Sequence, residues 1–277
     1  MSFSSTQLNT FQSCPKRYKF RYVDNLRKIE EGKESVDRNW GKGIHEGLAV
    51  LYKGGAREDI HKAFMNEYPV ALDEGDMAKT PESGLQCLDL YMDYWKEEDK
   101  KWKILDVETF GDFELNDTKF VTRLDLIAEH VQGSGIYFWD HKTTGKSLTF
   151  NFWSQFEMNS QVTAYTKYVS LKHGQCSGAI INGISIGFRK RGYRGLPPGF
   201  HCTFERQIFN RNKEQIADWE SNIQSWRDSI KWCGETGNWG KFEGRHCQYC
   251  DYKEICTSCD NAEIVKQLYE VKEYKDD

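Results

Sequence analysis

Apolar side chains recur at helical spacing through most of the first hundred residues. Leu8, Phe11 and Tyr18 follow this spacing and predict a helix over residues 5–22, with a serine available to cap its first turn. The same spacing predicts further helices over 35–51, 56–68 and 82–102. We therefore expect a mainly helical N-terminal region.

The pattern then changes to one typical of strands. Three segments rich in β-branched and aromatic residues are separated by turn-forming sequences, at 104–115, 119–130 and 135–142. Their short separation predicts adjacent, antiparallel strands. After them the pattern predicts a helix over 153–172, strands over 179–188 and 201–209, and a long helix over 211–233. The last forty residues are rich in cysteine and then in charge.

The composition is that of a packed globular protein. Of the 277 residues, 29% are charged and 14% are aromatic, which is the opposite of an aromatic-poor disordered chain. This length suits one large domain or a domain with an appended lobe. The net charge of −4 provides no overall field that would attract nucleic acid, so any such binding would depend on local basic clusters.

Two basic clusters are present. They contain Lys16, Arg17, Lys19 and Arg21, and Arg189, Lys190, Arg191 and Arg194. Each cluster is a candidate for contacting phosphates and is equally well explained as a solvated face of the protein.

No segment predicts membrane insertion or secretion. The longest weakly polar run, residues 179–188, is much shorter than the roughly 18 residues that span a bilayer. The N-terminus lacks a basic start followed by an apolar stretch, so no secretory signal is expected. We therefore expect a cytoplasmic protein without a membrane partner, located in the host cytoplasm if a virus encodes it.

Two carboxylates and a lysine stand on neighbouring predicted strands. Asp125 lies on one strand, and Asp140 and Lys142 lie on the next. Alternate strand residues share a face, so Asp140 and Lys142 project together, and strand pairing can bring Asp125 beside Asp140. Paired carboxylates suit Mg²⁺ or Mn²⁺, and an adjacent lysine can stabilise the transition state of phosphodiester hydrolysis. The Asp-x-Lys pattern alone is weak, because it often occurs by chance.

Two further segments supply context for this pattern. His45 follows Gly41 and Gly43 on a predicted helix, and Gln161 and Tyr165 lie four residues apart on one face of a later helix. All three also have structural explanations: His45 as a core histidine bonded to a backbone carbonyl, and the other two as ordinary helix residues.

With these motifs in this order, the chain resembles the RecB-like branch of the PD-(D/E)XK nucleases. That branch includes exonucleases associated with CRISPR adaptation and the nuclease domains of bacterial recombination helicases. The resemblance covers nearly the whole chain, from STQLNTFQSCPKRY at residues 5–18 to the final cysteines. It implies an α/β fold with a restriction-endonuclease-like core, in which helices flank a central mixed sheet, together with an N-terminal helical region and a C-terminal cysteine-rich lobe.

The resemblance also implies a metal site. His45, Asp125 and Asp140 would bind the ion with help from the backbone carbonyl of His141. One departure is mild: residues 122–124 read Thr-Arg-Leu before the aspartate, where the family usually has Gly-Arg-Ile or a similar sequence. By the same resemblance, Lys142 would be the catalytic lysine, and the helix pair Gln161 and Tyr165 would orient it and the DNA.

The nine cysteines raise the question of a second metal site. In a reducing compartment they favour metal ligation over disulfides, and four of them lie close together at Cys247, Cys250, Cys256 and Cys259. One explanation is a zinc site made of these four. The resemblance instead implies a [4Fe–4S] cluster held by Cys14, Cys247, Cys250 and Cys256, with the last cysteine left over.

A cluster of that kind would join the two ends of the chain. Residues 1–22 and 240–260 would together form a metal-cluster lobe within a single nuclease domain spanning 1–277. We expect no ATP site, because Gly145-Lys146-Ser147 lacks the upstream glycine and strand of a phosphate-binding loop. A motor such as a helicase, or another recombination partner, would be a separate protein.

The predicted activity is divalent-metal-dependent hydrolysis of DNA. We expect an exonuclease, or otherwise an endonuclease, that acts on single-stranded or end-bearing DNA in recombination, repair, or phage- or CRISPR-type DNA processing. The alternative is a catalytically idle module that binds nucleic acid or a protein partner and carries a structural zinc site. The complete set of Asp125, Asp140 and Lys142 favours the enzyme.

Overall fold

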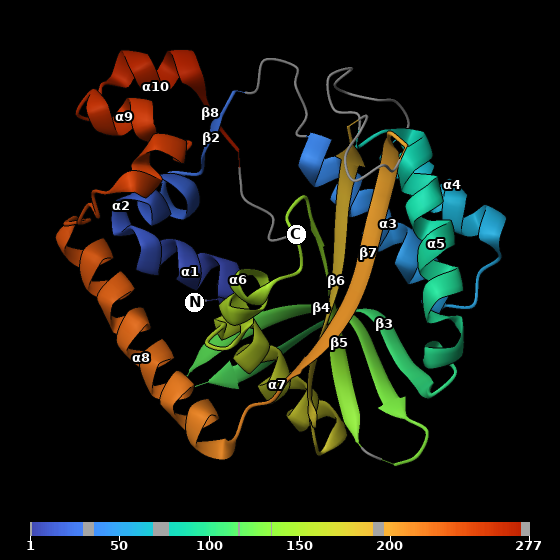
Figure 1. Ribbon diagram of the computed structural model, residues 1–277. Helices are drawn as coiled ribbons and strands as arrows, with labels where there is room; N and C mark the ends of the chain where they lie inside the picture. Colours follow the sequence, from blue (N-terminus) through green and yellow to red (C-terminus); the bar gives the residue numbers. More distant parts are fainter. Residues whose placement is uncertain are drawn as a thin grey trace. The chain divides into compact units, whose positions relative to one another are not determined.

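The computed structural model describes residues 2–29, 36–68, 78–115, 117–133, 135–190 and 197–272. The chain forms two compact units (Figure 1). The first consists of Met1–Gly32, Asp112–Val121 and Lys213–Asp277, and the second of Lys33–Gly111 and Thr122–Asn212.

The second unit holds most of the sheet. Its helical elements are α3 (Val36–Tyr52), α4 (Arg57–Glu67), α5 (Pro81–Asp99), α6 (Phe150–Trp153), η2 (Ser154–Phe156) and α7 (Ser160–His173). Its strands are β5 (Ile136–Thr144), β6 (Gly178–Arg189) and β7 (Gly199–Phe209), with the larger parts of β3 (Trp102–Leu115) and β4 (Thr118–His130).

The strand directions are mixed. β4 runs antiparallel to β5, with Leu126 opposite Trp139, and β3 pairs with the other side of β4. β5 runs parallel to β6, and β6 runs antiparallel to β7. The prediction of an α/β protein with a mixed central sheet flanked by helices is therefore confirmed.

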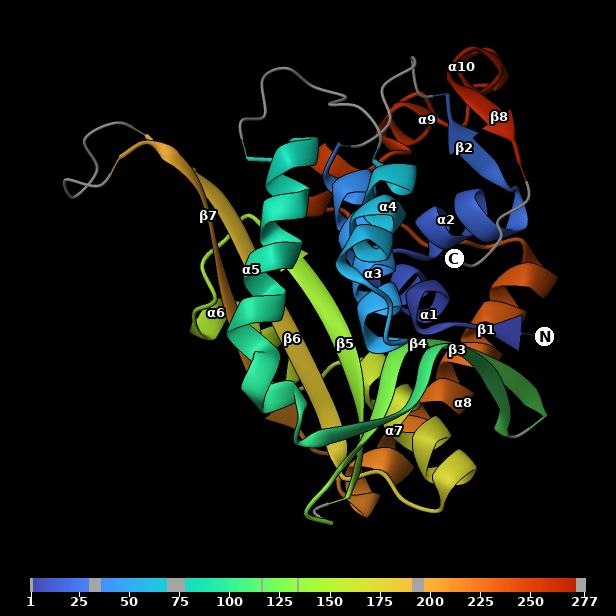
Figure 2. The ribbon, with the colours of Figure 1, turned by 90° about the vertical axis from the view of Figure 1, so that its right-hand side faces the viewer.

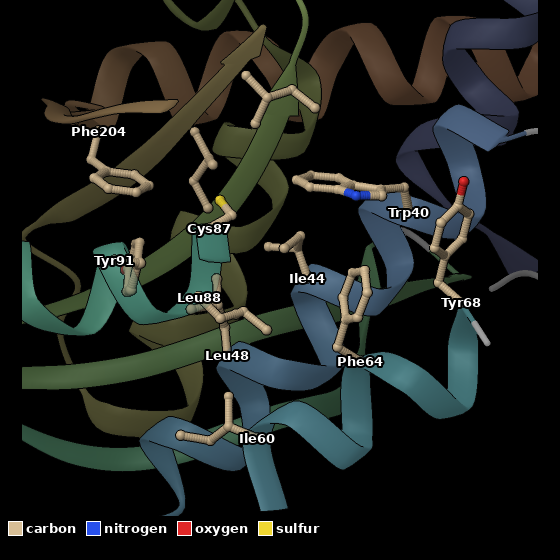
Figure 3. Close-up of a cluster of buried hydrophobic side chains, with 12 residues drawn as sticks. Trp40, Ile44, Leu48, Ile60, Phe64, Tyr68, Cys87, Leu88, Tyr91 and Phe204 are labelled. Carbon is tan, nitrogen blue, oxygen red and sulfur yellow. The ribbon is translucent and has the colours of Figure 1, made fainter. Parts of the chain in front are cut away.

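Helices α3, α4 and α5 pack together beside β6 and β7 (Figure 2). Their shared core of buried aromatic and aliphatic side chains is drawn in Figure 3. Trp40, Ile44 and Leu48 line one side of α3 and are 0% exposed, at the i, i+4, i+8 spacing expected of a buried helix face. This burial holds α3 in place, and it also holds His45, which directly follows Ile44 on the helix.

Helix α7 packs against β5 and β6. Tyr165 on α7 meets Phe138 on β5 edge-on, with ring centroids 5.6 Å apart. The predicted helix over 153–172 was wrong at its start, because α7 begins at Ser160. Asn159 caps it by accepting hydrogen bonds from the backbone amides of Gln161 and Val162, and the residues before it form the short α6 and η2 instead.

The first unit brings the two ends of the sequence together. Its elements are β1 (Ser2–Phe3), α1 (Ser5–Ser13), α2 (Pro15–Tyr18), η1 (Lys19–Val23), β2 (Leu26–Lys28), α8 (Lys213–Thr236), η4 (Arg245–Tyr249), α9 (Lys253–Thr257), α10 (Ala262–Leu268) and β8 (Tyr269–Val271). β2 pairs antiparallel with β8, and β1 pairs parallel with the start of β4. Lys16 N–H also donates to the carbonyl of Gly240 at 3.0 Å.

The predicted helix over 5–22 is not continuous. Cys14 adopts an extended backbone conformation between α1 and α2. The reason lies in the next residue, because the ring of Pro15 disfavours a helical conformation at the residue before it. Across all the described helices, none has the length and apolarity required to cross a membrane.

Candidate active site

The predicted catalytic residues come from four elements of the second unit. α3 provides His45, β4 provides Asp125, β5 provides Asp140 and Lys142, and α7 provides Gln161 and Tyr165. The structure brings them together through a chain of hydrogen bonds and ion pairs.

Asp125 is held by both of its oxygens. Its Oδ2 accepts a hydrogen bond from the backbone amide of His141 at 2.7 Å, and its Oδ1 lies 3.5 Å from Nδ1 of His45. Burial alone would raise the pKa of Asp125, but the neighbouring His45 outweighs this effect and holds the pKa well below its ordinary value. Asp125 is therefore ionised, as a metal ligand must be.

Lys142 joins Asp140 to the helix pair. Its Nζ lies 2.9 Å and 2.8 Å from the two oxygens of Asp140 and 3.5 Å from Oε1 of Gln161. Nε2 of Gln161 in turn donates to the hydroxyl of Tyr165 at 3.0 Å. Burial alone would lower the pKa of Lys142, but Asp140 and Asp125 raise it above its ordinary value, so the amine carries a positive charge.

Burial and the charge of Asp125 raise the pKa of Asp140, against the opposing effect of Lys142. A pair of neighbouring carboxylates resists double ionisation until a cation binds between them. The charges of the two aspartates therefore influence each other across the paired strands.

Sequence reasoning missed Glu108. In the part of the chain that the structure describes, one trio of potential metal ligands has its ligand atoms within 4.8 Å of one another, and it consists of His45, Glu108 and Asp125. One imidazole and two carboxylates are a suitable donor set for Mn²⁺ or Mg²⁺. The trio does not include Asp140, whose oxygens face Lys142.

The backbone at Glu108 adopts a left-handed conformation, with a φ of 52° in the middle of β3. Nε of Arg123 lies 3.2 Å from its carboxylate. Burial, and then the charge of Asp125, raise the pKa of Glu108. No signal in the sequence singles this residue out, because a glutamate on a half-exposed strand is ordinary.

The side chain of His141 points away from Asp140 and Lys142, as strand alternation predicts. Its ring stacks on Tyr52 at 5.8 Å, and its Nδ1 lies 2.7 Å from Nδ2 of Asn182. Burial lowers the pKa of His141 to about 3, so the ring is neutral. Nδ1 is the acceptor of the Asn182 amide, which leaves the backbone of His141 as the part that faces Asp125.

A buried arginine is connected to His141 through a network of hydrogen bonds. Arg206 on β7 lies between the rings of Trp95 and Trp139, at 3.8 Å and 4.2 Å from their centroids. It donates to Asp99 at 2.6 Å and to the hydroxyls of Tyr52 and Tyr91 at 3.0 Å and 2.9 Å.

The Tyr91 hydroxyl accepts from Asn182 at 2.8 Å, and Asn182 contacts His141. The network thus runs from β7 to the strand that carries the candidate catalytic residues.

The candidate cluster cysteines belong to the first unit, and all nine cysteines of the chain are free thiols. Burial raises the pKa values of Cys250 and Cys256, and the charge of Cys14 raises them further. Cys259 is exposed.

The basic clusters are only partly described. Arg191 and Arg194 lie outside the described residues. In the N-terminal cluster, Lys16 forms an ion pair with Asp260, and Lys19 pairs with Asp24 at 2.5 Å.

Comparison with known families decides the class of protein. Residues 2–257 match the family model of the PD-(D/E)XK nuclease superfamily. The chain belongs to this superfamily. It is therefore a nuclease of a class that hydrolyses phosphodiester bonds with divalent metal ions.

Solved structures include similar folds at low identity. A candidate exonuclease from Eubacterium rectale is 12% identical, with a TM-score of 0.49 over 89% of this chain and 86% of that chain. A protein designated SSO0001 is 14% identical, with a TM-score of 0.37 over 92% of this chain and 85% of that chain. No curated protein matches the sequence.

Proposed function

We propose that this PD-(D/E)XK protein is a divalent-metal-dependent DNA exonuclease of the RecB-like branch that acts on single-stranded or end-bearing DNA. The observation that carries the proposal is the contact of Lys142 with both Asp140 and Gln161. Lys142 lies on β5, and the backbone of the same strand holds Asp125 through the amide of His141. Metal-binding carboxylates and a charged amine in one site are what phosphodiester hydrolysis requires.

In the proposed mechanism, a set of side chains and one backbone carbonyl would bind the metal ion. His45, Asp125 and Asp140, with the backbone carbonyl of His141, would hold the Mg²⁺ or Mn²⁺ ion, and Glu108 would join them. When bound, the ion supplies Lewis acidity toward the phosphate and toward an attacking water.

Lys142 places a positive charge beside the reacting phosphate and helps to position the water. Gln161 is hydrogen-bonded to Tyr165, and the pair orients the lysine and the DNA.

A [4Fe–4S] cluster on Cys14, Cys247, Cys250 and Cys256 is the second part of the proposal, and Zn²⁺ is the alternative cofactor. The electrostatic effect of Cys14 on Cys250 and Cys256 supports the cluster. It would join residues 1–22 to 240–260 by covalent bonds to one metal group, within a single nuclease domain spanning 1–277.

The setting that fits this activity is DNA recombination, repair, or phage- or CRISPR-type DNA processing in the cytoplasm, with unwinding supplied by a separate helicase or recombination protein. Residues 145–147, which resemble the end of a phosphate-binding loop, lie after β5 and before the short α6. That position differs from the strand-to-long-helix junction of an ATP site.

Digestion of end-labelled DNA with and without Mn²⁺ tests the proposal. Asp140→Ala and Lys142→Ala should each abolish cleavage, and Lys103→Ala, an exposed lysine on β3, should cleave as the wild type does. Circular single-stranded DNA should resist an exonuclease, whereas its cleavage would indicate an endonuclease. Undiminished digestion by both active-site variants would reject the mechanism and favour the binding-only alternative.

A further inference from the structure

A cavity of about 640 Å³ adjoins Lys142. Its walls come from the end of β5, the loop that follows, α6, η2 and the residue that caps α7. This volume is within the range of sites that hold small organic molecules.

The lining suits a ligand that is both anionic and aromatic. The charged residues that line it are Lys142 and Lys146, and no carboxylate is among the described lining residues. Hydroxyl and amide side chains make up the rest of its polar wall, and Ser147, Thr149 and Asn151 are exposed there. Two amines, several neutral hydrogen-bonding groups and an aromatic ring are the contacts that a nucleotide requires.

The aromatic wall is the ring of Phe152, which is half-buried. Its ring neighbours, Trp153 and Phe156, meet it at 84° and 68° in edge-to-face arrangements, so neither ring is stacked parallel to it. Gly183 lies opposite Lys142 in the β5–β6 register. Its lack of a side chain leaves room for the ring of Phe152, because a Cβ at Gly183 would lie only 3.2 Å from Cε1 of that ring.

Hydrogen bonds hold the walls of the cavity in place. The Ser185 hydroxyl on β6 donates to the carbonyl of Lys146 at 2.8 Å. Arg211 donates to the carbonyl of Phe156 at 2.8 Å and to the hydroxyl of Thr163 on α7 at 2.9 Å. A pre-formed wall lowers the entropy cost of binding.

We propose that this cavity binds one unpaired nucleotide of the DNA strand, next to the phosphate that is cleaved. Its base stacks on Phe152, and Lys146 contacts its phosphate. The inference rests on the proposed nuclease function and refines its substrate. A base in a duplex is paired and stacked on both sides, so the strand must be single at this position before the base can enter.

Binding without cleavage tests the cavity directly. A fluorescently labelled single-stranded oligonucleotide is titrated in EDTA, and its anisotropy is measured. Phe152→Ala should weaken binding by about fivefold or more, as loss of a base-stacking aromatic does. Phe152→Trp, which retains a ring, should restore binding. Phe150→Ala is the matched control, because that ring is 75% exposed and lies outside the lining.

A scan with one abasic position supplies a readout that a merely structural role would not change. For the wild-type protein in Mn²⁺, cleavage should slow when the abasic position falls next to the cleaved phosphate. Phe152→Ala should show no such dependence. Lys146→Gln, an exposed substitution that leaves the core intact, should weaken binding to every oligonucleotide in the scan equally.

The two proposals fail in different ways. A flat abasic scan for the wild type, unchanged binding by Phe152→Ala, or a larger loss for Phe150→Ala would overturn the nucleotide site, even if DNA is cleaved. The wild-type protein could instead bind the oligonucleotide through Phe152 and show no metal-dependent cleavage. That result would overturn the nuclease function and would still support the nucleotide site.

Discussion

The backbone amide of His141 donates a 2.7 Å hydrogen bond to the carboxylate of Asp125 on the neighbouring strand. One oxygen of Asp125 is therefore fixed by the sheet, and the other is directed toward His45, 3.5 Å away. The geometry of the candidate metal site thus depends on strand pairing as well as on its side chains.

Glu108 should contribute to metal affinity. Glu108→Gln keeps the size of the side chain and removes one of the two carboxylate charges of the trio, so the affinity for Mn²⁺ should fall by about tenfold or more. Isothermal titration or the electron paramagnetic resonance of free Mn²⁺ measures this directly. Glu129→Gln, an exposed glutamate near Lys103, is the control and should bind as the wild type does. Equal affinities for all three proteins would remove Glu108 from the site.

Metal binding should weaken as the pH falls. Burial lowers the pKa of His45, but Asp125 outweighs this and raises the pKa above its ordinary value of 6.5. A metal ion binds only the neutral imidazole, so protons compete with the ion below that raised pKa, and binding releases a proton. The Mn²⁺ dissociation constant should rise as the pH is lowered through neutrality. His45→Asn should bind more weakly and with a shallower pH dependence, and an unchanged slope would contradict this assignment.

Loss of Arg206 should destabilise the fold strongly. The side chain is 8% exposed, and its removal takes a buried cationic donor from Asp99 and from the hydroxyls of Tyr52 and Tyr91. Breaking a buried pair in this way costs about 3–5 kcal/mol. Urea unfolding of Arg206→Ala measures the loss. Arg57→Ala, which breaks an exposed pair with Asp89, should have little effect, and similar midpoints for both variants would refute the argument.

Two glycine substitutions should have opposite effects. A Cβ at Gly84 on α5 would overlap the ring of Phe64 in the helical core, so Gly84→Ala should cost about 1–3 kcal/mol. Gly234 lies in α8 with nothing within 4 Å of such a Cβ, and Gly234→Ala should stabilise by about 0.5–1 kcal/mol. Thermal unfolding compares the two, and a stabilised Gly84→Ala would show that the core has room there.

Cysteine substitutions should separate the two candidate cofactors of the first unit. An iron–sulfur cluster on Cys14 would be lost in Cys14→Ser and retained in Cys259→Ser, whereas a zinc site of the last four cysteines would show the reverse. Visible absorption and metal analysis of anaerobically purified proteins report both outcomes. Colourless wild-type protein that contains one zinc would reject the cluster.

The sequence was sufficient for the features that depend on local periodicity. Strand alternation placed Asp140 and Lys142 on one face and the side chain of His141 on the other, and the structure agrees. The break at Cys14 was equally open to prediction, because Pro15 follows it.

Features that depend on distant segments were beyond sequence reasoning. Arg206 and Asp99 form a hydrogen bond although more than a hundred residues separate them in the sequence, and the local sequence at neither position predicts the pairing. Glu108 joins His45 and Asp125 through an unusual backbone conformation in a strand, which its residue type does not favour. The start of α7 was misplaced because Trp153 and Phe156 continue an apolar pattern that the chain interrupts before Asn159.

The first unit is made of chain segments that come before and after the second unit, and this sets an order for folding during synthesis. Its residues 1–32 leave the ribosome before the second unit does, yet Leu26 of β2 pairs with Val271, which follows the second unit in the chain. The second unit ends at Asn212 and is complete before α8 and the last cysteines have been translated. The segment of the first unit that precedes the second unit in the chain is thus synthesised before it, yet this segment acquires its native neighbours only after residues 213–271 have been made.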